Sequence, residues 1–483
     1  MRHVLLTGVL LCAMWDAHGQ EQFGLLNSNY AGSDAVPMNP ARMATQWSWM
    51  DINLVGAGAF VWNDHVYMSG NDRSLLGEMG AGIRGAEGGK LNFYESLSSG
   101  GRHGFMNAHI AWPAVALNLG KHSFGAHVTT RTALSITGVG NDLARFAYNG
   151  LGYTPQHGIR YNDDRLSIAG GAWTQFGASY ARLIAAKENN LISGGVTAKY
   201  LMAHMGAGLD FSALDYAVLD TARAEVYDAS GIYGFAAPAM NAGRGWGFDI
   251  GATYERTLEN ADGYVPHASC DPMPYRYRIG VSLIDAGGMR FRDGTTGGFH
   301  ASTANFPDYN DIRLDSEEDA DSLLAASLST YESGSGFKMG LPTALAVQYD
   351  QRVLDHVYVA ADVVQNLAFG DNLRLRRPNS IAVVPRFELR RFEAAVPLVI
   401  HEYDLRRPSL GLMLRLNNVV LGSDNLLSLV SMPSAGRQRG GPFGTDVYFR
   451  IKWTVFRGPA CKGGKTRVHK AGVREAMPCK FPE

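Results

Sequence analysis

The stretch WGFDIGATYE, from Trp246 to Glu255, decides the fold class of this chain. Aromatic, aliphatic or alanine side chains occupy every second position, beginning at Trp246. The positions between them hold glycine, aspartate, threonine and glutamate. An alternation of period two places the two sets on opposite faces of a β-strand. The stretch therefore predicts a strand with one apolar face and one face that is small or charged.

The same alternation recurs along most of the chain, for example at 124–136, 275–283 and 447–455. We expect about fourteen strands, near 48–62, 104–119, 124–136, 166–184, 191–206, 244–256, 274–290, 337–351, 356–367, 379–390, 392–402, 409–416, 419–429 and 444–456. A soluble sandwich also alternates, with its apolar face turned inward. Segments of this length, with aromatic residues near their ends, instead favour an all-β, antiparallel transmembrane barrel.

The N-terminus supports the barrel interpretation. Arg2 and His3 precede an apolar stretch, 4–15, and small residues follow at Ala17 and Gly19. This is the pattern of a secretory signal peptide, and the apolar stretch is too short to cross a membrane as a helix. We therefore expect residues 1–19 to be removed after export, and the mature chain to reach the outer membrane.

Composition agrees with a barrel. Glycine accounts for 57 of the 483 residues, well above the usual ~7 %. Charged residues make up 18 % of the chain, below the usual ~25 %. Glycine suits walls that must twist and coil to close. A net charge of −1 argues against a nucleic-acid partner.

The connections between the expected strands alternate between short and long. Short turns of bacterial barrels face the periplasm and long loops face outward, which predicts that both termini are periplasmic. The long connection 257–273 lies on the short side and does not fit. We divide the chain into a signal peptide (1–19), an N-terminal plug-like segment (20–47), the barrel (48–456) and a basic periplasmic tail (457–483). Residues 20–47 either plug the lumen or hang in the periplasm. The tail is either solvated or binds an anionic component of the envelope.

Alternation also predicts which charges face the lumen. These are Arg131, Lys199, Asp249, Glu255, Arg276, Arg278, Arg415, Arg450 and Lys452. Isolated buried charges are costly, so these groups must pair with one another or be hydrated. A structural charge ladder and a polar permeation path are both open interpretations.

No motif indicates an enzyme, a cofactor or a metal site. Gly80 to Gly85 fits G-x-G-x-x-G but lacks the strand–turn–helix context of a dinucleotide site. His401-Glu402 lacks the second histidine of a zinc protease motif. Cys461 and Cys479 could form a disulfide in an oxidising periplasm, or could remain free thiols.

The Asn39-Pro40-Ala41 element just before the first expected strand predicts a stiff turn. Pro40 fixes its own φ and favours an extended conformation of Asn39, whose side chain bonds readily to nearby backbone. Such a turn either directs the preceding residues into the lumen or simply caps the strand.

Several segments resemble FadL-type barrels. YAGSDAVPMNPARMA at 30–44 resembles the segment before strand one of that family, and SGGVTAKYLMAHMGAGLDF at 193–211 is similar to its mid-barrel hairpin. The segments at 245–255, 275–291 and 421–430 resemble an uncharacterised group of FadL-like barrels related to the PorV and PorQ barrels of type IX secretion. The resemblance implies a fourteen-stranded barrel with an N-terminal plug, without implying one ligand.

Two function classes follow from these expectations. The first is a channel for a hydrophobic or amphipathic small molecule. The second is a non-transporting barrel that serves a secretion or envelope protein partner. Both have outer-membrane lipid as their surroundings. We expect a continuous lumen with an opening in the wall in the first class, and a filled lumen in the second.

Overall fold

The computed structural model describes residues 21–68, 93–96, 101–163, 165–221, 223–268, 271–306, 330–367, 373–426 and 444–459. The expected signal peptide, Cys461, Cys479 and nearly all of the basic tail lie outside these residues. No helix among the described residues is long and apolar enough to span a membrane.

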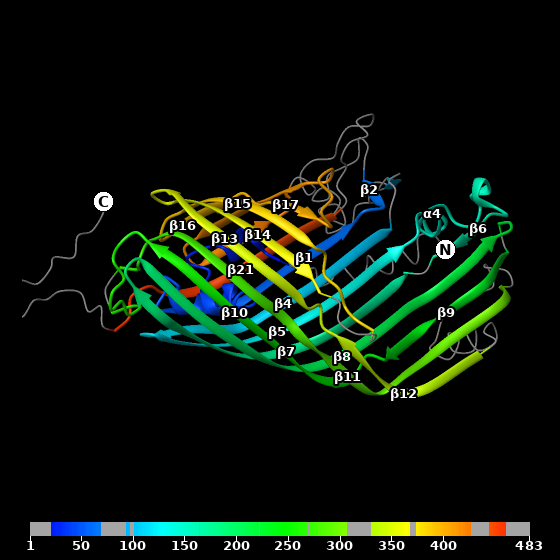
Figure 1. Cartoon of the computed structure of the whole chain (residues 1–483), viewed down its shortest axis with the longest axis horizontal. Coiled ribbons are helices and arrows are strands. Elements are labelled where there is room, and N and C mark those ends of the chain that lie inside the picture. Colours follow the sequence, from blue (N-terminus) through cyan, green and yellow to red (C-terminus); the bar gives the residue numbers. More distant parts are fainter. Residues whose placement is uncertain are drawn as a thin grey trace, which may run out of the picture.

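The strands form one closed antiparallel barrel of fourteen wall strands, as the alternation predicted (Figure 1). Closure comes from β1, which pairs with β21 on one side and with β4 on the other. The unbroken wall strands are β1 (Met50–Asn63), β4 (Arg102–Leu119), β5 (His122–Val139), β8 (Asn190–Val218), β11 (Tyr275–Phe306), β14 (Val357–Asn366), β15 (Ser380–Glu388), β20 (Val419–Ser423) and β21 (Gly444–Val455). Interrupted wall strands are β6 (Arg160–Asn162) with β7 (Ser167–Lys187), β9 (Ala224–Ala236) with β10 (Gly243–Thr257), β12 (Thr330–Gly340) with β13 (Ala344–Leu354), β16 (Phe392–Ala395) with β17 (Leu398–His401), and β18 (Ser409–Leu410) with β19 (Leu412–Leu416).

Short elements accompany the wall. They are α2 (Phe23–Leu26), η1 (Gly32–Ala35) and η2 (Pro40–Thr45) before β1, α4 (Asn141–Asn149) and η3 (Thr154–Gln156) after β5, and a hairpin of β2 (Val66–Met68) with β3 (Phe93–Glu95).

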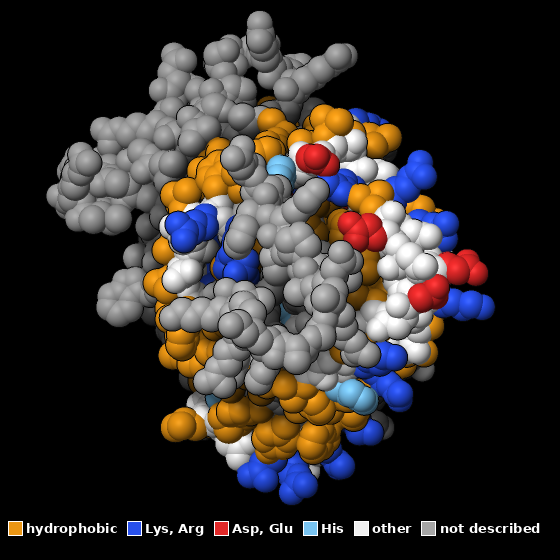
Figure 2. Space-filling model, turned by 90° about the vertical axis from the view of Figure 1, so that its left-hand side faces the viewer, with side chains coloured by type: hydrophobic (Ala, Val, Ile, Leu, Met, Phe, Trp, Pro, Cys, Tyr) orange, Lys and Arg blue, Asp and Glu red, His pale blue; other side chains and the backbone are white. Residues whose placement is uncertain are grey.

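The polarity of the wall distinguishes a membrane barrel from a soluble sandwich. Trp246 is 57 % exposed and Phe248 is 53 % exposed, whereas Asp249 between Phe248 and Ile250 is only 2 % exposed. Apolar side chains therefore point out of the barrel and charged ones point into it. Figure 2 looks onto the left-hand end of the barrel in Figure 1, and hydrophobic side chains make up much of the described surface around that end. This arrangement suits a wall surrounded by lipid.

Some wall strands are longer than the alternation predicted, so the barrel wall extends further on one side. We expected 207–243 and 291–336 to be loops, but β8 and β11 continue to Val218 and Phe306 and pair there with β9. β9 has glycines and an irregular burial pattern, so its sequence shows little alternation. Figure 1 shows the extended strands at the end opposite the C-terminus.

Residues 21–48, which we call the hatch, lie inside the barrel. Nearly all of them are buried, and η2 packs against β7, β8 and β10. Glu21 lies beside Phe60 and Trp62, close to the end of β1 from which the long connection leaves. Met50 pairs with Val455 at the other end of β1. Glu21 and Val455 therefore lie towards opposite ends of the barrel.

The long connection that follows β10 contacts the C-terminal end of the hatch, near Gln46. The ring of His267 bonds the carbonyl oxygen of Gln46 at 3.1 Å, and Ala261 packs against Leu183 and Leu191. A longer connection is needed here because it must reach across to the hatch as well as join two strands.

Candidate functional site: the hatch, the strap and a pocket in the lumen

The Asn39-Pro40-Ala41 turn joins the hatch to the wall. Asn39 is extended, and its side-chain oxygen accepts a 3.1 Å hydrogen bond from the backbone N–H of Ala41, which caps η2. Its amide donates to the carbonyl of Ala252 on β10. A Cβ placed on Gly251 would lie 2.2 Å from the Asn39 side chain, so glycine in the wall makes room for the turn.

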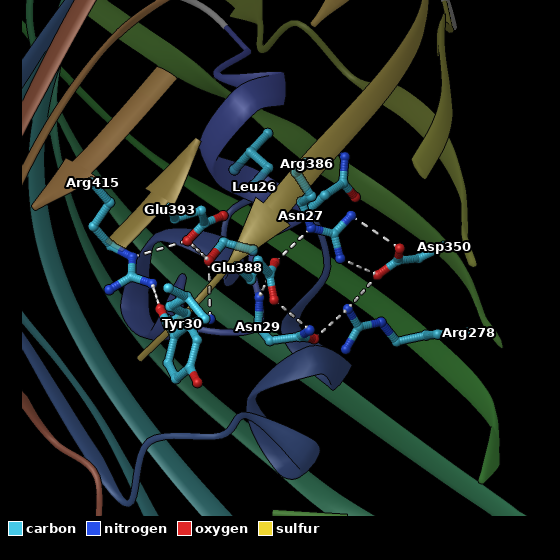
Figure 3. Close-up of polar contacts among 12 residues, drawn as sticks. Leu26, Asn27, Asn29, Tyr30, Arg278, Asp350, Arg386, Glu388, Glu393 and Arg415 are labelled. Atoms are coloured by element: carbon cyan, nitrogen blue, oxygen red, sulfur yellow. Dashed lines mark hydrogen bonds and ion pairs between the residues drawn. The ribbon is translucent and has the colours of Figure 1, made fainter. Parts of the chain in front are cut away.

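Buried carboxylates of the wall hold the middle of the hatch (Figure 3). The amide of Asn29 donates to Glu388 at 2.7 Å, and the hydroxyl of Ser28 donates to Glu393 at 2.7 Å. Arg415 forms an ion pair with Glu393 at 2.9 Å. The hatch therefore shares partners with the charge network of the wall, and a charged side chain of the wall loses a partner if the hatch leaves.

Beside these contacts, Asp350 on β13 joins two arginines. It pairs with Arg278 at 2.9 Å and with Arg386 at 2.7 Å, and both guanidinium groups are almost fully buried. Arg278 also reaches the side-chain oxygen of Asn29 at 3.1 Å. This cluster links β11, β13 and β15 beneath the hatch.

Asp34 links the hatch to the wall through two ion pairs. Its carboxylate lies 3.0 Å from Arg450 and 2.9 Å from Lys452, both on β21. Lys452 also lies 3.3 Å from Asp51 on β1, and it donates to the carbonyl of Ala31. All of these charged side chains are buried.

A second charge network lies higher in the lumen around Asp285. Its carboxylate contacts Arg131 at 2.8 Å, Lys199 at 2.7 Å and Arg377 at 2.5 Å. Lys199 also pairs with Asp249 at 2.7 Å. Ion pairs across the lumen favour the charge-ladder interpretation of the inward charges.

The structure places all but one of the predicted lumen charges inside the barrel. Arg276 is the exception: its side chain is exposed, whereas Tyr275 and Arg278 are buried. The register between β10 and β11 shifts here, since Arg256 faces Tyr277 and Thr257 faces Tyr275. The extra residue is a β-bulge, which moves Arg276 to the outer face.

Residues 373–379, which we call the strap, enter the lumen before β15. Leu373 and Leu375 are buried in an apolar cluster with Phe291 and Phe337. The backbone N–H of Arg376 donates to the Ser135 hydroxyl on the facing strand β5. The strap thus crosses the lumen above the hatch.

Arg377 connects the strap to the hatch. Its guanidinium lies 2.5 Å from Glu21 and 2.5 Å from Asp285, and it also donates to the carbonyl of Pro342. A single buried side chain therefore joins the first described residue of the hatch, the strap and the central charge network.

A small pocket with room for about one water molecule lies between the start of the hatch and the inner wall. Its apolar lining includes Phe23, Phe60, Trp62 and Val399, and its polar lining includes His401 and Asp424. Burial and the adjacent Asp446 raise the pKa of Asp424, in the turn after β20, well above its ordinary value. This pocket is the candidate binding site.

Some of these residues have a signal in the sequence. Asp350, Arg386 and Glu388 alternate with outward Tyr349 and Phe387, so period two could have identified them. Asp285 and Arg377 have no such signal, since neither lies in a regular alternation. Among the described residues, no three His, Cys, Asp or Glu side chains form a metal-binding group.

The fold and the occupied lumen define a barrel of the outer-membrane type with an internal hatch. Residues 50–424 match the model of a family of unknown function, DUF5723, and the chain belongs to that family. No curated protein matches it.

Solved structures to which this chain is similar include the Pseudomonas putida toluene transporter TodX, at 8 % identity and a TM-score of 0.41, covering 88 % of this chain and 94 % of TodX. The monoaromatic hydrocarbon channel CymD has 11 % identity and a TM-score of 0.38, covering 91 % and 97 %. A FadL homologue from Pseudomonas aeruginosa has 8 % identity and a TM-score of 0.22, covering 89 % and 95 %.

Proposed function

We propose that the protein is an outer-membrane channel that admits a small hydrophobic or amphipathic molecule through the pocket beside Glu21 and Phe23, at the start of the hatch. The observation that carries this proposal is the aromatic pocket, which lies in a lumen otherwise occupied by the hatch and the strap. Apolar walls with a few polar groups are typical of small-molecule sites. The short turns and the C-terminus face the periplasm in this proposal.

Passage requires both internal segments to move. The hatch fills the part of the lumen near the short turns between strands. The strap crosses the lumen on the side of the hatch away from these turns. Removing the hatch alone leaves the strap in place. We therefore expect deletion of residues 22–38 to raise single-channel conductance only modestly.

A combined variant tests the channel directly. It lacks 22–38 and carries a Gly/Ser sequence of equal length at 373–377. We expect a large, stable conductance in planar bilayers and entry of small solutes into proteoliposomes. A control with the same Gly/Ser exchange at 152–158, a rim segment, should conduct like the wild type.

Pocket occupancy is tested separately. Val399→Trp fills the pocket, because Val399 is buried and lines it, whereas Val383→Trp changes an outward position on β15. Uptake of the transported molecule should fall in the first variant and persist in the second. Equal uptake in both, or no conductance in the combined variant, would contradict the channel proposal.

A second candidate is a non-transporting barrel that serves a secretion or envelope partner, as in the PorV-like interpretation. The observation that favours it is that several buried ion pairs and hydrogen bonds hold the hatch in place. In that case the combined variant would conduct, but loss of the wild-type protein would impair protein secretion without changing small-molecule uptake.

A further inference from the structure

The pocket has an unusual balance of charge. Its lining includes three carboxylate residues, Glu21, Asp424 and Asp446, but neither lysine nor arginine. Glu21 is neutralised by Arg377. The two aspartates have no ion pair among the described residues.

Neutral donors surround these two aspartates instead. Asp424 accepts hydrogen bonds from the backbone N–H groups of Phe23 at 2.7 Å and Gly24 at 3.2 Å, and from the Tyr448 hydroxyl at 3.0 Å. Asp446 accepts from the backbone N–H groups of Asp424 at 2.8 Å and Asn425 at 2.7 Å. These bonds orient both carboxyl groups, but they supply no full positive charge. A buried carboxylate without a cation is costly.

Aromatic rings form the neighbouring wall of the pocket. The rings of Phe60 and His401 lie 5.1 Å apart, and those of Trp62 and His401 lie 5.7 Å apart. Trp62 is also stacked on Phe105 at 6.2 Å, which fixes its plane. The faces of Phe and Trp rings attract organic cations, and this attraction grows when water is excluded.

One further polar group of the pocket has no hydrogen-bond partner among the described residues. The Thr445 hydroxyl oxygen is buried, lines the pocket and makes no hydrogen bond there. Buried hydroxyls are nearly always hydrogen-bonded, so this one points to a missing partner such as a ligand or water.

We infer that the pocket, enlarged when the start of the hatch moves off Asp424, selects a small hydrophobic cation, such as an aromatic or alkyl amine or quaternary ammonium compound. A bound cation favours the ionised form of Asp424 and Asp446, which then neutralise its charge. The rings of Phe60 and Trp62 pack on its apolar part, and Thr445 offers a further hydrogen-bonding group. An anionic head group is disfavoured, because it would meet two aspartates and no free cation. This inference rests on the proposed function and narrows its substrate class.

Three probes of similar size separate charge from hydrophobicity. Benzyltrimethylammonium carries a permanent positive charge, neopentylbenzene is its neutral carbon analogue, and phenylacetate is an anion. Binding to the purified full-length protein in detergent is measured by calorimetry at mildly alkaline pH. We expect the cation to bind at least about tenfold more tightly than either other probe.

The aspartates are tested by Asp424→Asn combined with Asp446→Asn, which keeps size and most hydrogen-bonding capacity. The variant should lose the preference for the cation while retaining neopentylbenzene binding. Asp215→Asn, on the tall part of the wall, is the matched control and should retain the preference. Trp62→Leu provides a second test that leaves both carboxyl groups in place, and it should weaken cation binding. Heat-modifiable migration on a gel checks that each variant is folded.

The possible outcomes separate the two proposals. Equal binding of the cation and neopentylbenzene, unaffected by the aspartate variant, would overturn the cation inference while leaving a hydrophobic channel intact. Tighter binding of phenylacetate would overturn it as well. Binding of none of the three probes would count against both the inference and the pocket as a substrate site.

Discussion

The ion pairs of Asp34 give the sharpest prediction about how the hatch is held. Asp34→Asn removes the negative charge that faces Arg450 and Lys452 but keeps the shape of the side chain. Removing one partner of a buried ion pair costs about 3–5 kcal/mol. Part of this is retained, because asparagine still accepts a hydrogen bond and Lys452 keeps Asp51.

We therefore expect the hatch to lose about 2–3 kcal/mol of its binding free energy to the wall, which raises its detached population about 30- to 150-fold. The assay is cysteine labelling in proteoliposomes. Ala35→Cys, a buried position in η1, is introduced into a chain that lacks its natural cysteines. A labelling rate that follows the open population should rise by the same factor.

The control is Asp215→Asn, which breaks an exposed pair with Arg160 far from the hatch. Exposed pairs contribute little, so labelling at residue 35 should not change. A rise of less than about threefold in Asp34→Asn, with the barrel intact, would show that this ion pair does not hold the hatch.

Further predictions concern the barrel itself. The protein should fractionate with the outer membrane and migrate differently on a gel before and after heating; recovery as a soluble periplasmic protein would refute the membrane barrel. A tag inserted after Asn149 should be reachable on intact cells and a tag after Glu483 should not, whereas reversed labelling would invert the proposed orientation. Gly287→Ala should prevent assembly, because its φ is +146° and a Cβ would lie 2.1 Å from the carbonyl oxygen of Trp246. Gly152→Ala should be neutral within about 0.5 kcal/mol, since a Cβ there meets nothing within 4 Å; equal stability of both glycine variants would contradict the close-approach argument.

The amino-acid sequence by itself determined the barrel and the polarity of its faces. Period two is a local property of a strand. The opposite faces of Trp246 and Asp249 can therefore be predicted without knowing which strands lie next to theirs. The same rule located most of the inward charges, including Lys199 and Lys452. It failed at Arg276, because a bulge depends on how two strands pair.

The tertiary structure alone decided how the lumen is filled. Asp285, Arg377 and Glu21 are far apart in the chain, and only barrel closure brings their charges together. The height of β8 and β11 depended on pairing with glycine-rich β9, whose own sequence carries little strand signal. The pocket likewise combines rings from β1, a histidine from β17 and aspartates from either side of the 427–443 connection. Such a site has no local periodicity, because its residues are related only through the register of the closed wall.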